Sequence, residues 1–159
     1  LLAGVNMLTA DRIAALAVQT AEDSQKVVLP NAASFEEVDE DTVKGLDGSG
    51  QLAGYVITTE AKGYGGTIEV MTGITADVSG VVLLSQNETP GLGANATKES
   101  FTGQYQQAVP ESGFEVIKSG GADDGQIQAM TGATITSQAV TDAVNLAVEK
   151  YQTLEKGGN

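Results

Sequence analysis

Four hydroxyl side chains and one glycine lie within a single run of seven residues in the C-terminal third of this chain. The run reads Thr131-Gly132-Ala133-Thr134-Ile135-Thr136-Ser137, and a helix-like pattern follows it. Because the chain contains neither cysteine nor histidine, these hydroxyls are its best candidates for a nucleophile. Ser and Thr are also favoured at helix N-caps, so capping is the alternative interpretation of the same residues.

The position of this run at the start of a helix suggests what it would bind. A helix N-terminus offers unpaired backbone N–H groups and the positive end of the helix dipole, which both suit a phosphate. Gly132 and Ala133 keep the approach uncrowded. A threonine hydroxyl there could bind a phosphate or be esterified by one. The run is not a P-loop, because no Gly-Lys-Thr follows a glycine-rich segment.

Two further segments are candidates for the walls of a ligand site. Glu88-Thr89-Pro90-Gly91-Leu92-Gly93 combines a stiff proline with glycines that let the backbone approach a ligand closely. Gly63-Tyr64-Gly65-Gly66 places an aromatic ring between glycines, where it could stack on a flat ligand or cover the edge of the core. Each segment alone is also compatible with an ordinary turn.

Composition limits the chemistry that the protein can perform. The 159 residues are 41% hydrophobic, which is typical of one folded domain, and the formal net charge is −13. Nucleic acid is therefore not expected as a partner, because phosphate contacts need clustered Lys and Arg. The absence of Cys and His excludes disulfides, iron–sulfur clusters and Ser-His-Asp catalysis. Any redox work would have to be carried by an organic cofactor.

Strand and helix patterns are partly segregated along the chain, which predicts the α+β class. Strands are expected at residues 52–59, 67–74 and 81–84, joined by turns as an antiparallel meander. Phe35 and Val38 are possible strand positions in an acidic stretch that otherwise has the character of a solvated surface.

Helices are expected at residues 10–28, 97–108 and 137–154, and Pro30 should end the first of them. Two short strands at residues 114–118 and 126–130 are expected between the second and third helices. Apolar residues of the last helix recur at steps of three and four and form one stripe that should face the core: Val140, Val144, Ala147, Tyr151 and Leu154.

Taken in order, the three glycine- and hydroxyl-rich segments closely resemble the FMN-binding domain of the G subunit of the Rnf electron-transport complex. They are similar, less closely, to the C subunit of the sodium-translocating NADH:quinone oxidoreductase. The resemblance covers nearly all of the chain and implies a single FMN-binding domain, with an antiparallel sheet flanked by helices, at residues 10–159. Residues 1–9 look like the end of the family's single N-terminal membrane helix, removed from this chain.

The resemblance implies how the cofactor is attached. In this family FMN is joined through its phosphate to the side-chain oxygen of the final Thr in a [Ser/Thr]-Gly-Ala-Thr motif. That position is Thr134 here, and Thr131 takes the first position. A separate flavin transferase makes the bond, using FAD and a divalent metal. The transferase motif usually has an acidic residue where this chain has Gln128.

The resemblance also implies which residues surround the cofactor. Residues expected around the phosphate are Gly132, Ala133, Ile135, Thr136 and Ser137, with the hydroxyls of Thr136 and Ser137 as hydrogen-bond donors. Residues expected beside the flavin are Glu88, Thr89, Gly91, Leu92 and Gly93, with Leu92 against the ring and further contacts from Tyr64 and Gly65. Glu88 could instead brace its loop by accepting backbone N–H groups.

The implied function is that of an electron carrier rather than a complete enzyme. The domain would lie on the extracytoplasmic side of the cell membrane and relay electrons between ferredoxin and NAD, coupled to ion translocation. Its partners would be the other subunits of the complex. Two alternatives stay open: a free-standing or lipid-anchored extracellular flavoprotein, and a flavin-free binding module of the same fold. Gln128 is the observation that favours the second alternative.

Overall fold

The computed structural model describes residues 23–75, 77–110, 112–118, 120 and 123–157. Residues 1–9 and most of the helix expected at 10–28 lie outside this part of the chain. Its described end, residues 23–28, is helical and stops before Pro30, as predicted. Among the described residues, no helix combines the length and the apolar character that crossing a membrane requires.

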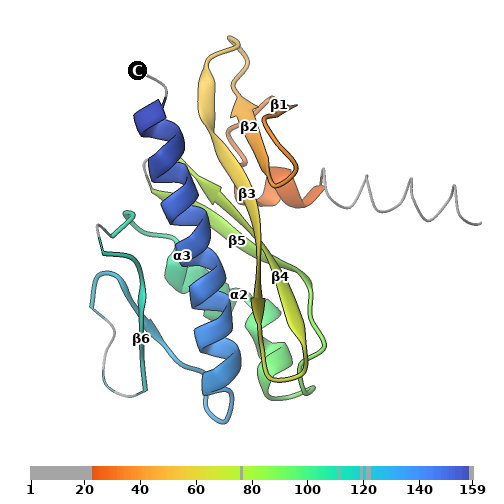
Figure 1. Ribbon diagram of the computed structural model, residues 1–159, viewed down its shortest axis with the longest axis vertical. Helices are drawn as coiled ribbons and strands as arrows, with labels where there is room; N and C mark the ends of the chain where they lie inside the picture. The colour runs from red at the N-terminus through yellow and green to blue at the C-terminus, as the bar shows by residue number, and fades with distance from the viewer. Residues whose placement is uncertain (1–22, 76, 111, 119, 121–122, 158–159) are drawn as a thin grey trace, which may run out of the picture.

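Five strands form an antiparallel meander in the order β1-β2-β3-β4-β5, which confirms the predicted topology (Figure 1). The strands are β1 Ser34–Glu37, β2 Thr42–Leu46, β3 Leu52–Lys62, β4 Thr67–Ile74 and β5 Val78–Ser85. β4 has the predicted bounds, whereas β3 and β5 are longer than expected. β2 was not predicted, and of the two candidate strand positions only Phe35 lies within β1.

Helix α3, Thr134–Gly157, packs along one face of this sheet (Figure 1). Four residues of its predicted apolar stripe are buried, and Leu154 packs at their edge. In β4, Ile68 and Val70 point toward α3 and Met71 belongs to a second cluster on the opposite face. This alternation is the period of two that a β-strand imposes. The antiparallel sheet and the helices together establish the α+β class.

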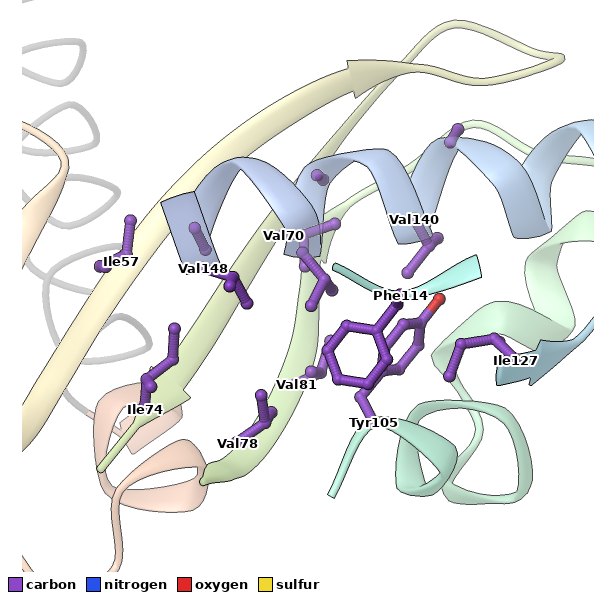
Figure 2. Close-up of a cluster of buried hydrophobic side chains, with 14 of the residues drawn as sticks. Ile57, Val70, Ile74, Val78, Val81, Tyr105, Phe114, Ile127, Val140 and Val148 are labelled. Atoms are coloured by element: carbon purple, nitrogen blue, oxygen red, sulfur yellow. The ribbon is translucent and has the colours of Figure 1, made fainter. Parts of the chain in front are cut away.

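Two apolar clusters of different size lie on the two faces of the sheet. The larger one joins β3, β4, β5 and α3, and it includes the rings of Tyr105 and Phe114, which meet edge to face with centroids 5.3 Å apart (Figure 2). The smaller one packs Val28 and Leu29 against Val56 of β3. The larger cluster therefore anchors α3, and with it the residues at the start of this helix.

The single helix predicted at residues 97–108 is wrong. The segment contains three short elements: η1 Gly93–Thr97, α2 Glu99–Thr102 and η2 Gly103–Tyr105. Lys98 adopts an extended conformation, with φ −81° and ψ 144°, and this interrupts the helical path. The spacing of Phe101 and Tyr105 was nevertheless informative, because their rings pack edge to face in the core.

Strands β6, Glu115–Ile117, and β7, Gln126–Gln128, form a separate two-stranded parallel sheet. Both are shorter than predicted. Side-chain amides attach this pair to the rest of the fold. Asn145 of α3 bonds both backbone groups of Phe114, with its Oδ1 2.7 Å from the nitrogen and its Nδ2 2.9 Å from the oxygen. Gln104 bonds both backbone groups of Gln128 in the same way, at 2.8 and 3.2 Å.

Candidate functional site

Helix α3 begins without a side-chain cap. Thr134 is its first residue, and the carbonyl of Ala133 accepts the Ser137 N–H at 3.0 Å, so Ala133 takes the N-cap position. The methyl side chain of alanine cannot accept a hydrogen bond from the first N–H groups of the helix. In the described part of the chain, no hydrogen bond is found from the N–H groups of Thr134, Ile135 and Thr136. The helix therefore starts with donors available to a bound anion.

The hydroxyls of the cluster have different environments. Thr136 is buried and donates to Glu88 Oε1 at 2.7 Å. Ser137 is buried, donates to the Ala133 carbonyl at 2.8 Å and accepts the Met130 N–H at 2.9 Å. Both protons are committed to protein acceptors, so the geometry does not support the expectation that they bond a phosphate. Thr134 is exposed, and no hydrogen bond to its hydroxyl is found within the described ranges.

A cavity of about 450 Å³ opens at the start of α3, a volume within the usual range for small-molecule sites. It is lined by residues from all three segments that the sequence singled out: Tyr64, Thr89, Leu92, Gly93, Gly132, Ala133, Thr134, Ile135 and Thr136. Five other predicted site residues do not line it: Gly65, Glu88, Gly91, Thr131 and Ser137. Of these, Thr131 lines a neighbouring depression with Lys98 and Gln104.

Glu88 holds the three segments together from behind the cavity. Its side chain is only 5% exposed. One carboxylate oxygen accepts the Tyr64 N–H at 2.8 Å and the Thr136 hydroxyl, and the other accepts the Gly65 N–H. Glu88 therefore acts as a brace that accepts backbone N–H groups, but its donors lie in the turn before β4 and in α3 rather than in its own loop, where they had been expected.

Glycines make room for this buried carboxylate. A Cβ atom on Gly93 would come within 2.5 Å of Thr136 Oγ1 and 2.8 Å of Glu88 Cβ. A Cβ on Gly65 would overlap the Asn87 carbonyl, and one on Gly63 would overlap Glu88 Oε1. The sequence predicted Gly93 and Gly65 as flavin neighbours, and it placed Gly63 in a candidate segment without giving it a role. These glycines serve the contact with Glu88 rather than an open approach to a ligand.

The carboxylate of Glu88 is charged at neutral pH. Burial alone would raise its pKa, but the hydrogen bonds from Thr136, Gly65 and Tyr64 outweigh burial and hold the pKa below the ordinary value of 4.5. A buried anion with three donors is stable only while all three donors keep their positions. The charged form of Glu88 thus holds Tyr64, Gly65 and Thr136 in place, and loss of this charge would weaken the cavity wall.

The chemical character of the cavity fits FMN. Three large apolar side chains that line it are exposed: Tyr64 at 73%, Leu92 at 45% and Ile135 at 57%. Exposed apolar side chains around one cavity mark a binding surface, and they suit a flat aromatic ring. The uncapped N–H groups and the exposed Thr134 hydroxyl suit the phosphate. Thr134, Leu92 and Tyr64 therefore line one cavity at the start of α3.

Comparisons with known proteins agree with this geometry. Residues 63–149 match the family model of the FMN-binding domain. The chain is 40% identical to the G subunit of the proton-translocating ferredoxin:NAD(+) oxidoreductase complex of Clostridium ljungdahlii, over 99% of this chain and 85% of that protein. It is 38% identical to the G subunit of the corresponding Na(+)-translocating complex of Acetobacterium woodii, over 98% and 85%.

A solved structure supports the fold independently. The crystal structure of Shewanella oneidensis NqrC superposes with a TM-score of 0.59 at 21% identity, covering 78% of this chain and 67% of that one. The match to the family model, residues 63–149, includes Glu88 and every residue that lines the cavity. It extends from Gly63 through most of α3. The chain therefore belongs to the FMN-binding domain family and, within it, to the G subunits of Rnf-type ion-translocating oxidoreductase complexes.

Proposed function

We propose that this domain is an electron carrier whose FMN is esterified to Thr134 Oγ, and that it serves in an ion-translocating ferredoxin:NAD oxidoreductase complex. The observation that carries the proposal is the position of Thr134, whose exposed hydroxyl lines the cavity at an uncapped helix start. FMN supplies one- and two-electron chemistry when bound. Leu92, Tyr64 and Ile135 would orient the ring, and the first N–H groups of α3 would hold the phosphate.

The attachment step balances with FAD as the flavin donor. Thr134 Oγ forms a bond to the flavin-side phosphorus, the bond between the two phosphates breaks, AMP leaves and the hydroxyl proton is released. A flavin transferase would catalyse this step. The other hydroxyls are poorer acceptors, because Thr136 and Ser137 are buried with committed protons and Thr131 lines a different depression.

Intact-mass measurement after co-expression with a flavin transferase tests the ester. The expected gain is one FMN less one water, and peptide mapping should place it on Thr134. Flavin fluorescence should survive denaturation and vanish in Thr134→Ala, while Thr131→Ala keeps it. Fluorescence that persists in Thr134→Ala would move the ester elsewhere. No gain in the wild-type domain would favour the flavin-free module, for which Gln128 already argues.

The proposed location is the extracytoplasmic side of the cell membrane. The similarity to the G subunits of two ion-translocating complexes, over 85% of their length, supports assembly with other subunits. Protease added to intact cells should degrade the domain in the native protein while a cytoplasmic marker survives. Protection until the membrane is disrupted would contradict the proposed side, and purification without other subunits would favour the free-standing flavoprotein.

A further inference from the structure

The cavity has an unusual charge environment for a phosphate ligand. The described residues that line it carry no formal charge. The buried Glu88 carboxylate lies behind the wall, bonded to the Thr136 hydroxyl and the Tyr64 backbone. Sites that capture free phosphorylated ligands commonly use Arg or Lys. Here the attraction comes from the backbone N–H groups and dipole at the start of α3.

The two forms of the phosphate differ in charge. A phosphate monoester, as in free FMN, carries about −1.5 to −2 at neutral pH. A phosphodiester to Thr134 would carry a single negative charge, because one acidic oxygen is used in the ester. Glu88 and the net charge of −13 oppose every added negative charge. The dipole of α3 attracts each of these charges, so the balance between this attraction and the repulsion decides whether the second charge of the monoester adds affinity.

We propose that this cavity discriminates against the dianionic phosphate of free FMN, because repulsion from Glu88 and from the net charge offsets the attraction of the α3 N–H groups. The N–H groups then position the phosphate without adding net affinity, and the ester and the contacts to the ring retain the flavin. The proposal rests on the proposed function and extends it to the specificity of the unmodified domain. That domain should recognise riboflavin, which has no phosphate, at least as well as FMN.

Titration of the unmodified domain with each flavin tests this directly. The protein is produced without a flavin transferase, and flavin fluorescence is followed at low ionic strength, where charge effects are largest. FMN is expected to bind no more tightly than riboflavin. A conventional phosphate site with one or two charge-assisted hydrogen bonds would favour FMN by about tenfold or more. Such a preference in the wild-type domain would overturn the proposal.

A lysine side chain added at the cavity should create a preference for FMN over riboflavin. Ile135 lines the cavity and its side chain is exposed, so Ile135→Lys is compatible with folding. This variant should bind FMN roughly tenfold more tightly relative to riboflavin than the wild type does. Leu146→Lys is the matched control, because Leu146 is exposed on the same helix and lines a different depression. If both variants gained the same preference for FMN over riboflavin, the charge environment of the cavity would not be its cause and the proposal would be overturned.

The remaining outcomes also decide the proposal. If neither flavin binds the wild type measurably, a gain of FMN binding in Ile135→Lys supports the proposal and no gain overturns it. Lys98 lines the neighbouring depression. Lys98→Ala should leave the ratio of the two affinities unchanged, and a selective loss of FMN affinity would show that Lys98 serves the phosphate and overturn the proposal.

Failure of this inference can be told apart from failure of the proposed function. A domain that gains no FMN from the transferase, yet binds riboflavin as well as FMN, refutes only the ester. A domain esterified at Thr134 that binds free FMN far more tightly than riboflavin, before modification, refutes only the charge discrimination.

Discussion

The five-stranded sheet with α3 and the small β6–β7 pair are stabilised by different interactions. The first region is closed by apolar side chains packed between the sheet and α3, among them Ile57 of β3 and Val140 of α3 (Figure 2). The second contributes Ile127 to this core. Amide side chains connect its strand ends to the rest of the fold, Asn145 at Phe114 and Gln104 at Gln128.

The difference implies that the apolar core determines the stability of the whole domain, whereas the amide hydrogen bonds determine the local order of the β6–β7 pair. Apolar burial is non-directional and scales with area, so it stabilises the whole domain together. Side-chain amide bonds to backbone are directional and contribute less each, so their loss should release a short segment first. The functional cavity combines both kinds of interaction, because α3 is anchored by the core while Glu88 joins the cavity walls by hydrogen bonds.

The largest effect should come from a cavity in the sheet–helix core. Ile57 is fully buried on β3, so Ile57→Ala should lower the free energy of unfolding by about 2–5 kcal/mol. Urea unfolding followed by far-UV circular dichroism measures this. Leu52→Ala on the same strand is the control, since Leu52 is exposed and should change stability by no more than about 0.5 kcal/mol. Equal losses in both would contradict the central role of this core.

Removing an amide should loosen the β6–β7 pair selectively. Asn145→Leu keeps the side-chain size but leaves the N–H and C=O of Phe114 without their partner, at a local cost of about 2 kcal/mol. Hydrogen exchange should accelerate in β6 and β7 while β3 and β4 keep their protection. Leu146→Asn, an exposed neighbour, serves as control. Uniform acceleration across both sheets would show that the two regions unfold as one.

The brace at the cavity should depend on pH. Because the pKa of Glu88 is lowered in the folded state, its charged form stabilises the fold above the ordinary pKa of 4.5, and this contribution is lost as pH falls through the lowered value. Glu88→Gln should cost about 1–2 kcal/mol at neutral pH. The cost should shrink in acid. Glu60→Gln, at an exposed position, is the control and should change stability by no more than about 0.5 kcal/mol at neutral pH. A pH-independent cost for Glu88→Gln would argue against a charged brace.

The smallest expected effect is a gain in stability from a substitution within the sheet. Thr72 is buried on β4, and its hydroxyl has no hydrogen-bond partner in the described part of the molecule. Thr72→Val should therefore stabilise the domain by about 1 kcal/mol. Thr141→Val is the opposite case, because the Thr141 hydroxyl bonds the Ser137 carbonyl and the Tyr105 hydroxyl. The midpoint temperature of thermal unfolding should rise for Thr72→Val and fall for Thr141→Val.

Residues whose pattern reflects local geometry were well predicted from sequence. The alternation in β4 and the stripe on α3 follow from the periods of strand and helix. The bounds of α3 were less accurate, because the helix begins at Thr134 rather than at the expected residue 137. The helix at 97–108 failed because Lys98 adopts an extended conformation that apolar spacing does not reveal. The amide anchors also escaped prediction, since Gln104 and Asn145 gain their meaning only from partners distant in sequence.

The same limit applies to the site. The pairing of Glu88 with Thr136 and with the turn before β4 joins residues that lie far apart in the chain. Sequence alone suggested a bracing role for Glu88 but not its partners. The role of Gly63 was not predicted for the same reason, because the space it leaves is defined by the Glu88 side chain. A glycine next to an aromatic residue was the one available signal.

The alanine before α3 has a consequence for how this sequence can vary. Ser or Asn in place of Ala133 would cap the helix and add roughly 1 kcal/mol to the stability of the unmodified domain. The same side chain would occupy N–H groups that the proposed phosphate needs. Position 133 is therefore a point of trade-off, where a residue that improves folding competes with the cofactor. In the flavin-loaded domain the phosphate itself would act as the cap.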